Sequence, residues 1–270
     1  MVPTIHLVRH AEGFHNLGIA NHRLPDPSLT PPGVNQCRRL GKDFPYMKQV
    51  GLVVASPLRR TIYTALYAFD DVLCEKELQI IALPEVQETT DLPCDTGSSV
   101  DELKQEFRGK PVDLNHLSRT WNRKDGKWSP VPEKVAERAK EARKWLRSRK
   151  EDHVVVVTHG GFLHYLTEDW NGYSHLFGRY TPSTEEIRHH QRLTVYLGTG
   201  WANTEFRTYV FDENRSESAS LIEIEESKTH REGKVKALDE KKTNLQSNQG
   251  YRQMQSHSTS NGASHTPAKV

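Results

Sequence analysis

Short apolar runs rich in β-branched residues alternate along the chain with longer segments whose apolar residues recur at helical spacing. The runs predict strands, and the longer segments predict helices. Because strands that alternate with helices are typical of a parallel sheet, the pattern predicts an α/β fold. We expect strands at residues 2–8, 52–55, 79–83, 153–157, 193–197 and 205–211, and helices at 33–48, 59–69, 132–150 and 161–169.

The order of these elements predicts three layers, with a mostly parallel sheet between helices. We expect a catalytic domain over residues 1–212, with a small insertion at about 88–132 over the C-terminal edge of the sheet. After Asp212 the sequence turns to interleaved charges and then to Ser, Asn and Gln. Such a segment buries too little apolar surface to offset its conformational entropy, so a disordered tail is expected over residues 213–270.

The composition and charge of the chain limit which partners and which cellular compartment are expected. The formal net charge of +2 at pH 7 is too small to indicate nucleic acid or a membrane surface. The chain enters its first strand at once, so no signal peptide is expected, and no apolar run approaches membrane-spanning length. Cys37, Cys74 and Cys94 show no pairing pattern, as in a reducing compartment. We expect a cytoplasmic protein with neither nucleic-acid nor membrane partners, and the sequence leaves its oligomeric state open.

Three of the predicted strands end in ionisable or glycine-rich segments. The carboxyl ends of parallel strands meet at one edge of a sheet, where α/β proteins bind ligands. A glycine pair that opens a helix also leaves amide donors free for an anion. The sequence therefore predicts an anion site built from Arg9-His10, Ser56-Pro57-Leu58-Arg59-Arg60 and Thr158-His159-Gly160-Gly161.

These segments resemble the motifs of the histidine phosphatase superfamily, in its phosphoglycerate mutase-like branch, over about residues 1–210. Arg9-His10-Ala11 followed by Asn16 resembles the Arg-His-Gly signature, with Ala11 in place of glycine. The added methyl group is expected to be tolerated if the backbone keeps a negative φ. The resemblance implies that Arg60, rather than Arg59, is the catalytic arginine. The other matching segments are Leu29-Thr30-Pro31-Pro32-Gly33-Val34-Asn35-Gln36, Ser56-Pro57-Leu58-Arg59-Arg60-Thr61, Val86-Gln87-Glu88 and Thr158-His159-Gly160-Gly161.

The chemistry of these residue types agrees with phosphoryl transfer. A neutral imidazole has a free lone pair and can attack phosphorus, which makes His10 the candidate nucleophile. The transferred group spreads its charge over three oxygens, and arginine matches phosphate oxygens with a planar pair of donors. The predicted catalytic residues are His10, Glu88, His159, Arg9 and Arg60. The predicted substrate-binding residues are Arg9, Asn16, Arg60, His159 and Gly160.

A carboxylic acid with a raised pKa can protonate the leaving alkoxide and later accept a proton from water. Glu88 is the candidate acid, and Glu85 in the same polar loop is the alternative. The loop 91–99 that follows is rich in turn residues. Its Ser99 and Glu102 have the spacing of a capping box, so the loop either only starts a helix or also covers the cleft.

Metal and cofactor chemistry is not indicated by the spacings. The chain has neither a His-Glu-x-x-His nor a Cys-x-x-Cys motif, and it has no phosphate-binding Gly-x-x-x-x-Gly-Lys loop. Six further histidines are therefore expected to be scaffold or surface residues, and neither a metal nor a cofactor is predicted. These are His15, His22, His164, His175, His189 and His190.

The leading hypothesis is metal-independent hydrolysis of a small-molecule phosphate monoester through a phosphohistidine at His10. The first alternative is a phosphoglycerate-type mutase, which returns the phosphoryl group to a bound acceptor instead of water. The resemblance implies a longer insertion in mutases than the one between Glu88 and the helix at 132–150, which favours the phosphatase. A catalytically silent scaffold that binds phosphorylated ligands is the alternative of another class.

Overall fold

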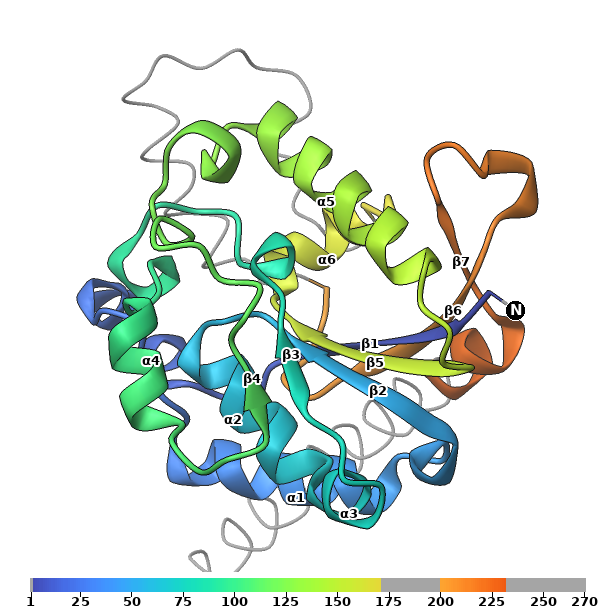
Figure 1. Ribbon diagram of the computed structural model, residues 1–270, viewed down its shortest axis with the longest axis horizontal. Coiled ribbons are helices and arrows are strands. Elements are labelled where there is room, and N and C mark those ends of the chain that lie inside the picture. The colour runs from blue at the N-terminus through green and yellow to red at the C-terminus, as the bar shows by residue number, and fades with distance from the viewer. Residues whose placement is uncertain (1, 171–199, 232–270) are drawn as a thin grey trace, which may run out of the picture. The chain divides into compact units, whose positions relative to one another are not determined.

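The computed structural model describes residues 2–170 and 200–231. Its centre is a seven-stranded sheet in the order β4-β3-β2-β5-β1-β6-β7 (Figure 1). The five strands from β4 to β1 run parallel, and β6 and β7 are antiparallel to their neighbours. The strands are β1 (Thr4–Arg9), β2 (Val50–Ala55), β3 (Ile80–Ala82), β4 (Val112–Asp113), β5 (His153–Thr158), β6 (Phe206–Phe211) and β7 (Leu221–Glu223).

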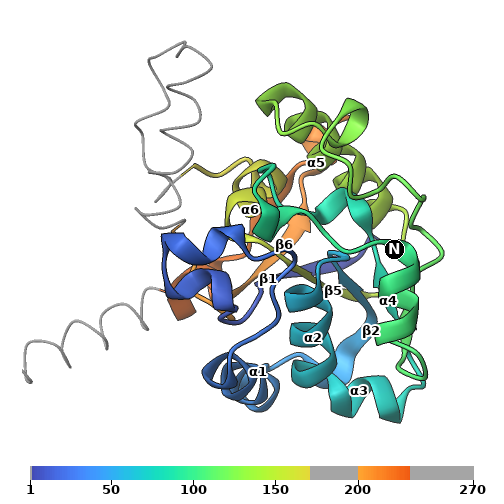
Figure 2. The same ribbon diagram turned by 90° about the vertical axis from the view of Figure 1, so that its left-hand side faces the viewer.

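Helices cover both faces of this sheet, as Figures 1 and 2 show. The helices α1 (Pro31–Asp43), α2 (Arg59–Ala68) and α3 (Asp70–Glu75) lie on one face. The helices α5 (Pro132–Arg147) and α6 (Gly160–Thr167) lie on the other face, and α4 (Val100–Glu106) belongs to the insertion. The fold is therefore the predicted mostly parallel sheet between helical layers.

The central strand β5 shows why its sequence is an unbroken run of valines. Val155 and Val157 pack in the core beneath α1 and α2, whereas Val154 and Val156 pack in the core beneath α5 and α6. All four side chains have no exposed surface. A strand that is buried on both faces needs apolar residues at every position, so the alternation of a half-exposed strand is absent.

Helix α1 begins through local capping that its sequence encodes. The hydroxyl of Thr30 accepts a hydrogen bond from the amide of Gly33 at 3.0 Å. Pro31 and Pro32 occupy the first helical positions, where an amide donor has no intrahelical acceptor. A Cβ at Gly33 would lie 2.1 Å from the carbonyl oxygen of Glu12, so only glycine lets the chain before α1 approach this closely.

The strand register brings the chemistry-bearing segments to one edge. Arg9 pairs with Thr158 across β1 and β5, and Ala55 pairs with Val157 across β2 and β5. The chain therefore leaves all three strands at the same level, immediately before His10, Ser56 and His159.

Several elements were not predicted from the sequence. These include the two-residue strand β4, the short helix α3 and the edge strand β7. The strand expected at residues 193–197 lies outside the described residues. The predicted capping box at α4 is confirmed, because Ser99 accepts from the amide of Glu102 and the carboxylate of Glu102 accepts from the amide of Ser99.

The boundary expected at residue 212 is corrected by the structure. The compact unit that carries the sheet extends to Ile224. Ala219 and Leu221 are buried in its core, and β7 pairs with β6. The charged composition after Asp212 hid this short strand, because its few apolar residues are interrupted by polar ones. Residues 225–231 are helical, and the rest of the expected tail lies outside the described residues. None of the described helices is both long and apolar enough to cross a membrane.

Candidate active site

His10 directly follows β1 and is enclosed by the protein, with 2% of its surface exposed. Its amide donates to the carbonyl oxygen of Thr158, and its carbonyl oxygen accepts from Nδ2 of Asn203, both at 2.9 Å. Its ring Nδ1 lies 2.7 Å from the carbonyl oxygen of Ala11. Because a carbonyl oxygen can only accept, Nδ1 carries the proton and Nε2 holds the lone pair.

The charge state of His10 favours nucleophilic attack. Burial, and then the nearby guanidinium groups of Arg60 and Arg9, hold the pKa of His10 well below its usual value of 6.5. The ring is therefore neutral at physiological pH. Ala11 has no positive φ, so the alanine at this position is accommodated as the sequence predicted.

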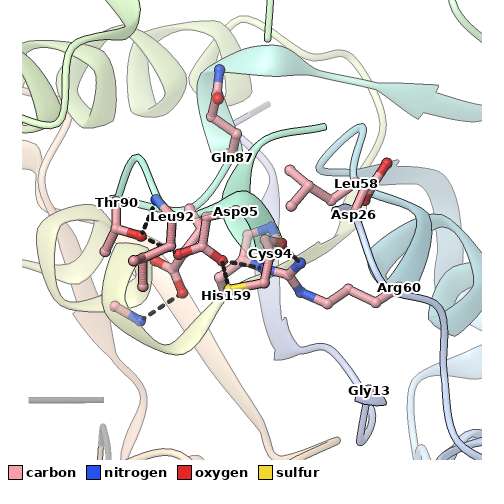
Figure 3. Close-up of polar contacts among 12 residues, drawn as sticks. Gly13, Asp26, Leu58, Arg60, Gln87, Thr90, Leu92, Cys94, Asp95 and His159 are labelled. Carbon is pink, nitrogen blue, oxygen red and sulfur yellow. Dashed lines mark hydrogen bonds and ion pairs between the residues drawn. The ribbon is translucent and has the colours of Figure 1, made fainter. Parts of the chain in front are cut away.

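Arg60 lies at the start of α2 and is fully buried. Its Nη1 donates to the carbonyl oxygen of Cys94 at 2.6 Å, and its Nη2 donates to Oδ1 of Asp95 at 2.9 Å (Figure 3). The preceding Arg59 instead pairs with Glu106 at 2.8 Å, and a third of its side chain is exposed. The structure thus places Arg60 inside the site and Arg59 at the surface.

His159 joins Arg60 to the turn after β2. Its Nδ1 lies 3.1 Å from Nη2 of Arg60, and its Nε2 lies 2.8 Å from Oγ of Ser56. A guanidinium only donates, so Nδ1 accepts and Nε2–H donates to the serine. Burial, followed by the charge of Arg60, lowers the pKa of His159 well below 6.5. Because both ring nitrogens have partners within the chain, His159 orients Arg60, and its ring centroid lies 5.2 Å from that of His10.

Three buried nitrogen atoms of residues close to His10 have no hydrogen-bond partner within the described chain. They are Nε of Arg9, Nε of Arg60 and Nδ1 of His15. A buried polar group without a partner costs about 1–3 kcal/mol. An anion bound beside His10 would satisfy the arginine donors. The other end of Arg9 is fixed, since its Nη1 donates to the carbonyl oxygen of Trp201.

His15 belongs to this cluster, although the sequence placed it among the scaffold or surface residues. It lies in a short 3-10 helix (Phe14–Leu17), and its ring centroid is 5.2 Å from that of His10. A Cβ at Gly13 would lie 2.9 Å from Nδ1 of His15, so glycine makes room for the ring. The Gly13-x-His15 spacing was the available signal in the sequence.

Asn16 shapes the loop after His10 and lies at the surface. Its Oδ1 accepts from the amide of Gly13 at 3.0 Å. Its Nδ2 makes no hydrogen bond within the described chain, so this donor is available to a ligand.

Glu88 occupies the amino-terminal end of α6. Its Oε1 accepts from the amides of Thr89 and Phe162 at 2.9 and 3.0 Å, and its Oε2 accepts from Gly161 at 3.4 Å. A Cβ at Gly161 would lie 2.7 Å from Oε1, so glycine lets the carboxyl group approach the helix. Gly160 is the first residue of α6. The amide of Gly161, one of the glycine pair that was expected to leave donors free for an anion, thus holds Glu88.

The environment of Glu88 fits a proton donor. Burial and then the charge of Asp95 raise its pKa, against the opposing effects of Arg60 and the amide donors. The backbone on either side is held by Arg138 of α5. Its guanidinium donates to the carbonyl oxygens of Glu85, Gln87 and Glu88 at 2.9, 2.5 and 3.2 Å.

Glu85, the alternative acid, faces a different group. Its Oε1 pairs with Nζ of Lys127 at 2.8 Å, and its side chain is partly exposed. Glu85 is therefore held by an ion pair with Lys127, whereas Glu88 is held by backbone amides at the start of α6.

The loop 91–99 lies over Arg60 and is fastened by a residue that sequence reasoning missed. Oδ1 of Asp26 accepts from the amide of Arg59 at 3.0 Å, and its Oδ2 accepts from the amide of Ser98 at 2.9 Å. Asp26 therefore ties the first turn of α2 to the loop. Asp95 in turn accepts from the hydroxyl of Thr90 at 2.5 Å (Figure 3). No local motif marks either aspartate, because Asp26 meets Arg59 and Ser98, and Asp95 meets Arg60, across long stretches of sequence.

The other histidines that the sequence assigned to the scaffold or surface divide into two groups. His22 and His164 are buried in the described fold. His175, His189 and His190 lie outside the described residues. Within residues 2–170 and 200–231, no three His, Cys, Asp or Glu side chains are grouped so that they could hold a metal ion.

Comparison with known proteins identifies the class. Residues 5–188 match the family described as the histidine phosphatase superfamily (branch 1), and the chain belongs to this family. It is 34% identical over 202 residues to an Arabidopsis thaliana protein named "Phosphoglycerate mutase-like protein", covering 60% of this chain and 73% of that protein. It is 31% identical over 168 residues to "Putative phosphoserine phosphatase 2" of Hydrogenobacter thermophilus, covering 59% of this chain and 74% of that protein.

A solved structure shares the fold. The ecdysone phosphate phosphatase from Bombix mori, in complex with tungstate, superimposes with a TM-score of 0.53 at 13% identity. The match covers 82% of this chain and 92% of the other.

Proposed function

We propose that this protein hydrolyses phosphate monoesters through a phosphohistidine formed at His10. One observation carries the proposal. The enclosed, neutral ring of His10 holds its lone pair at Nε2 and lies close to the charges of Arg9 and Arg60, whose buried Nε donors have no hydrogen-bond partner within the described chain. A nucleophile surrounded by donors that lack an acceptor is suited to an anionic electrophile such as a phosphoryl group.

In the first step Nε2 of His10 attacks phosphorus, and the bond between phosphorus and the ester oxygen breaks. The leaving alkoxide takes a proton from Glu88, which becomes a carboxylate. In the second step water attacks phosphorus and gives a proton to Glu88, and the P–N bond breaks. Inorganic phosphate leaves, and both His10 and Glu88 return to their starting forms.

The charge on the transferring group is stabilised by the chain itself. Arg9, Arg60 and Nδ2 of Asn16 supply donors to the phosphoryl oxygens. His159 holds Arg60 through Nδ1, and Gly160 starts the helix whose next amides hold Glu88. The proposal assigns no step to a metal ion or a cofactor.

The two alternatives differ in the fate of the phosphoryl group. A phosphoglycerate-type mutase would return it to a second hydroxyl of the bound acceptor. A silent scaffold would bind the phosphate group without forming a P–N bond.

Rapid quenching of the protein with a ³²P-labelled monoester tests the proposal. We expect a phosphorylated protein whose label is lost in acid and kept in alkali, as for a phosphoramidate, followed by release of labelled inorganic phosphate. His10→Ala should lose the label and essentially all turnover. His116→Ala, which changes an exposed histidine, should keep both.

Three other outcomes of these experiments would each contradict the proposal. Transfer of the label to an added phosphoglycerate acceptor, without release of phosphate, would establish the mutase. Tight binding of tungstate without any labelled protein would establish the scaffold. Turnover that survives in His10→Ala would overturn the phosphohistidine mechanism.

A further inference from the structure

Two lysines of the insertion, three residues apart, have opposite environments. Lys127 pairs with the carboxylates of Glu85 and Glu141 at 2.8 and 2.9 Å. Lys124 is partly buried, and its Nζ donates to a neutral acceptor, Oε1 of Gln87, at 2.9 Å. Within the described chain no carboxylate forms an ion pair with Lys124. Such an ammonium group keeps unused donors and an unneutralised charge.

The position of Lys124 is fixed by its neighbours. Trp121 is fully buried, and a Cβ at Gly97 would lie 2.1 Å from its ring. Nδ2 of Asn122 donates to the carbonyl oxygen of Gly97 at 2.9 Å, and Nε2 of Gln87 donates to that of Trp121 at 3.1 Å. The segment that carries Lys124 is therefore anchored to both the loop 91–99 and the residue before Glu88.

The electrostatic surroundings place Lys124 at the candidate site. It interacts with the charges of Asp95, Arg138, Glu88 and Arg60, and its own charge helps to lower the pKa of His159. Burial is the main cause that lowers the pKa of Lys124 to about 8. For Lys127, hydrogen bonds to the two glutamates outweigh burial and raise the pKa. A desolvated cation without a carboxylate partner is unfavourable unless an anion binds to it.

We propose that Lys124 binds a second anionic group of the substrate, either a carboxylate or a second phosphate. The group lies on the alkoxide side of the scissile phosphate, because Gln87 holds Lys124 beside Glu88, the residue that protonates the leaving oxygen. This inference rests on the proposed phosphatase activity and narrows its substrates to monoesters whose alcohol part carries an anionic group.

Matched pairs of substrates test the inference. O-phosphoserine and O-phosphoethanolamine differ by one carboxylate, and a hexose 1,6-bisphosphate and the 6-phosphate differ by one phosphate. The readout is the ratio of kcat/KM for the more anionic member of a pair to that for the other. Comparing the two pairs distinguishes a carboxylate from a second phosphate.

We expect wild type to prefer the more anionic member of at least one pair, and Lys124→Met to lower that ratio tenfold or more, chiefly through KM. Lys127→Met, which removes a lysine already paired with carboxylates, should keep the ratio. Lys124→Arg should retain part of it because the charge remains. Thermal melting of each variant shows whether it is folded, and Lys124→Gln provides a second neutral substitution if the methionine variant does not fold.

The failures of the two proposals are distinguishable. If wild type releases no phosphate from p-nitrophenyl phosphate or any pair member, the phosphatase proposal fails and this inference fails with it. If wild type is active but prefers neither anionic member, or if Lys124→Met keeps the preference, only the role of Lys124 is overturned.

Discussion

Nη2 of Arg60 donates a hydrogen bond of 2.9 Å to Oδ1 of Asp95, and both side chains are buried. The aspartate thereby partly neutralises the arginine assigned to the phosphoryl group. It also contributes to raising the pKa of Glu88, after burial. Asp95 thus links the charge of Arg60, the proposed phosphate-binding residue, to the protonation of Glu88, the proposed acid.

Asp95→Asn is predicted to lower the pKa of Glu88, because a neighbouring negative charge is removed. The alkaline limb of the kcat/KM profile for an alkyl phosphate should then move to lower pH. The free energy of unfolding should fall by about 1–3 kcal/mol, since Arg60 keeps an acceptor but loses its counter-charge. Asp91→Asn, which changes an exposed residue of the same loop, should alter neither quantity. An active variant with an unmoved alkaline limb would contradict the link.

Glu88→Gln is predicted to slow alkyl phosphates by roughly 10²–10⁴-fold, because their alkoxide needs a proton to leave. p-Nitrophenyl phosphate should slow much less, since its phenolate leaves without help. Steady-state kinetics on both substrates measure the difference. Glu85→Gln is the matched control and should show no leaving-group dependence, because Glu85 pairs with Lys127. A leaving-group effect in the Glu85 variant instead would transfer the acid role to that residue.

Gly161→Ala is predicted to displace the carboxyl group of Glu88, because the new Cβ would lie 2.7 Å from Oε1. Turnover of alkyl phosphates should fall by about 10²-fold, as expected when a catalytic group is displaced by about an ångström. Gly18→Ala is the control, because nothing lies within 4 Å of its Cβ position. Equal activity of the two variants would show that Glu88 does not act from its position at the amino-terminal end of α6.

Acid is predicted to destabilise the fold through buried neutral histidines. His6 donates or accepts hydrogen bonds with Thr208 and His153, both at 3.0 Å, and burial lowers its pKa to about 3. Above pH 6.5 neither the folded nor the unfolded state protonates this residue. Between about pH 6.5 and 3 the unfolded state binds the extra proton, so stability falls by up to about 1.4 kcal/mol per pH unit for each such group.

Urea unfolding from pH 7 to pH 4 measures this slope. His6→Phe, which retains a ring against Tyr46, should reduce the slope relative to wild type. A slope unchanged by the substitution would show that other groups control acid stability.

Removal of residues after Ile224 is predicted to leave thermal stability close to that of the full chain. Removal after Asp212 should lower the free energy of unfolding by roughly 3 kcal/mol or more, because Ala219 and Leu221 leave the core and β6 loses its partner. Thermal melting of the two truncated proteins tests the position of the boundary. Equal melting temperatures would show that β7 adds little to stability.

The sequence by itself determined the local parts of this protein. Apolar runs predicted β1, β2 and β5, since burial on both faces of a parallel sheet requires such runs. The antiparallel strand β6 was also predicted. Short motifs marked the starts of α1 and α4, because helix capping depends on residues only three positions apart. The segments around His10, Arg60 and His159 were also visible, since each follows a strand or opens a helix. The segment around Glu88 was visible only through its resemblance to the family motif.

Tertiary structure decided the connections among these parts. Asp95 meets Arg60, Asp26 meets Ser98, and Lys124 meets Gln87 across 35, 72 and 37 positions of sequence. Such contacts have no periodicity, and each depends on how an insertion packs over a sheet edge. The tautomer of His159, the position of Glu88 at the start of α6 and the burial of His15 likewise arise only when distant segments meet. A side chain acquires its pKa and its free donors from these neighbours, so the chemistry of the site is a property of the fold.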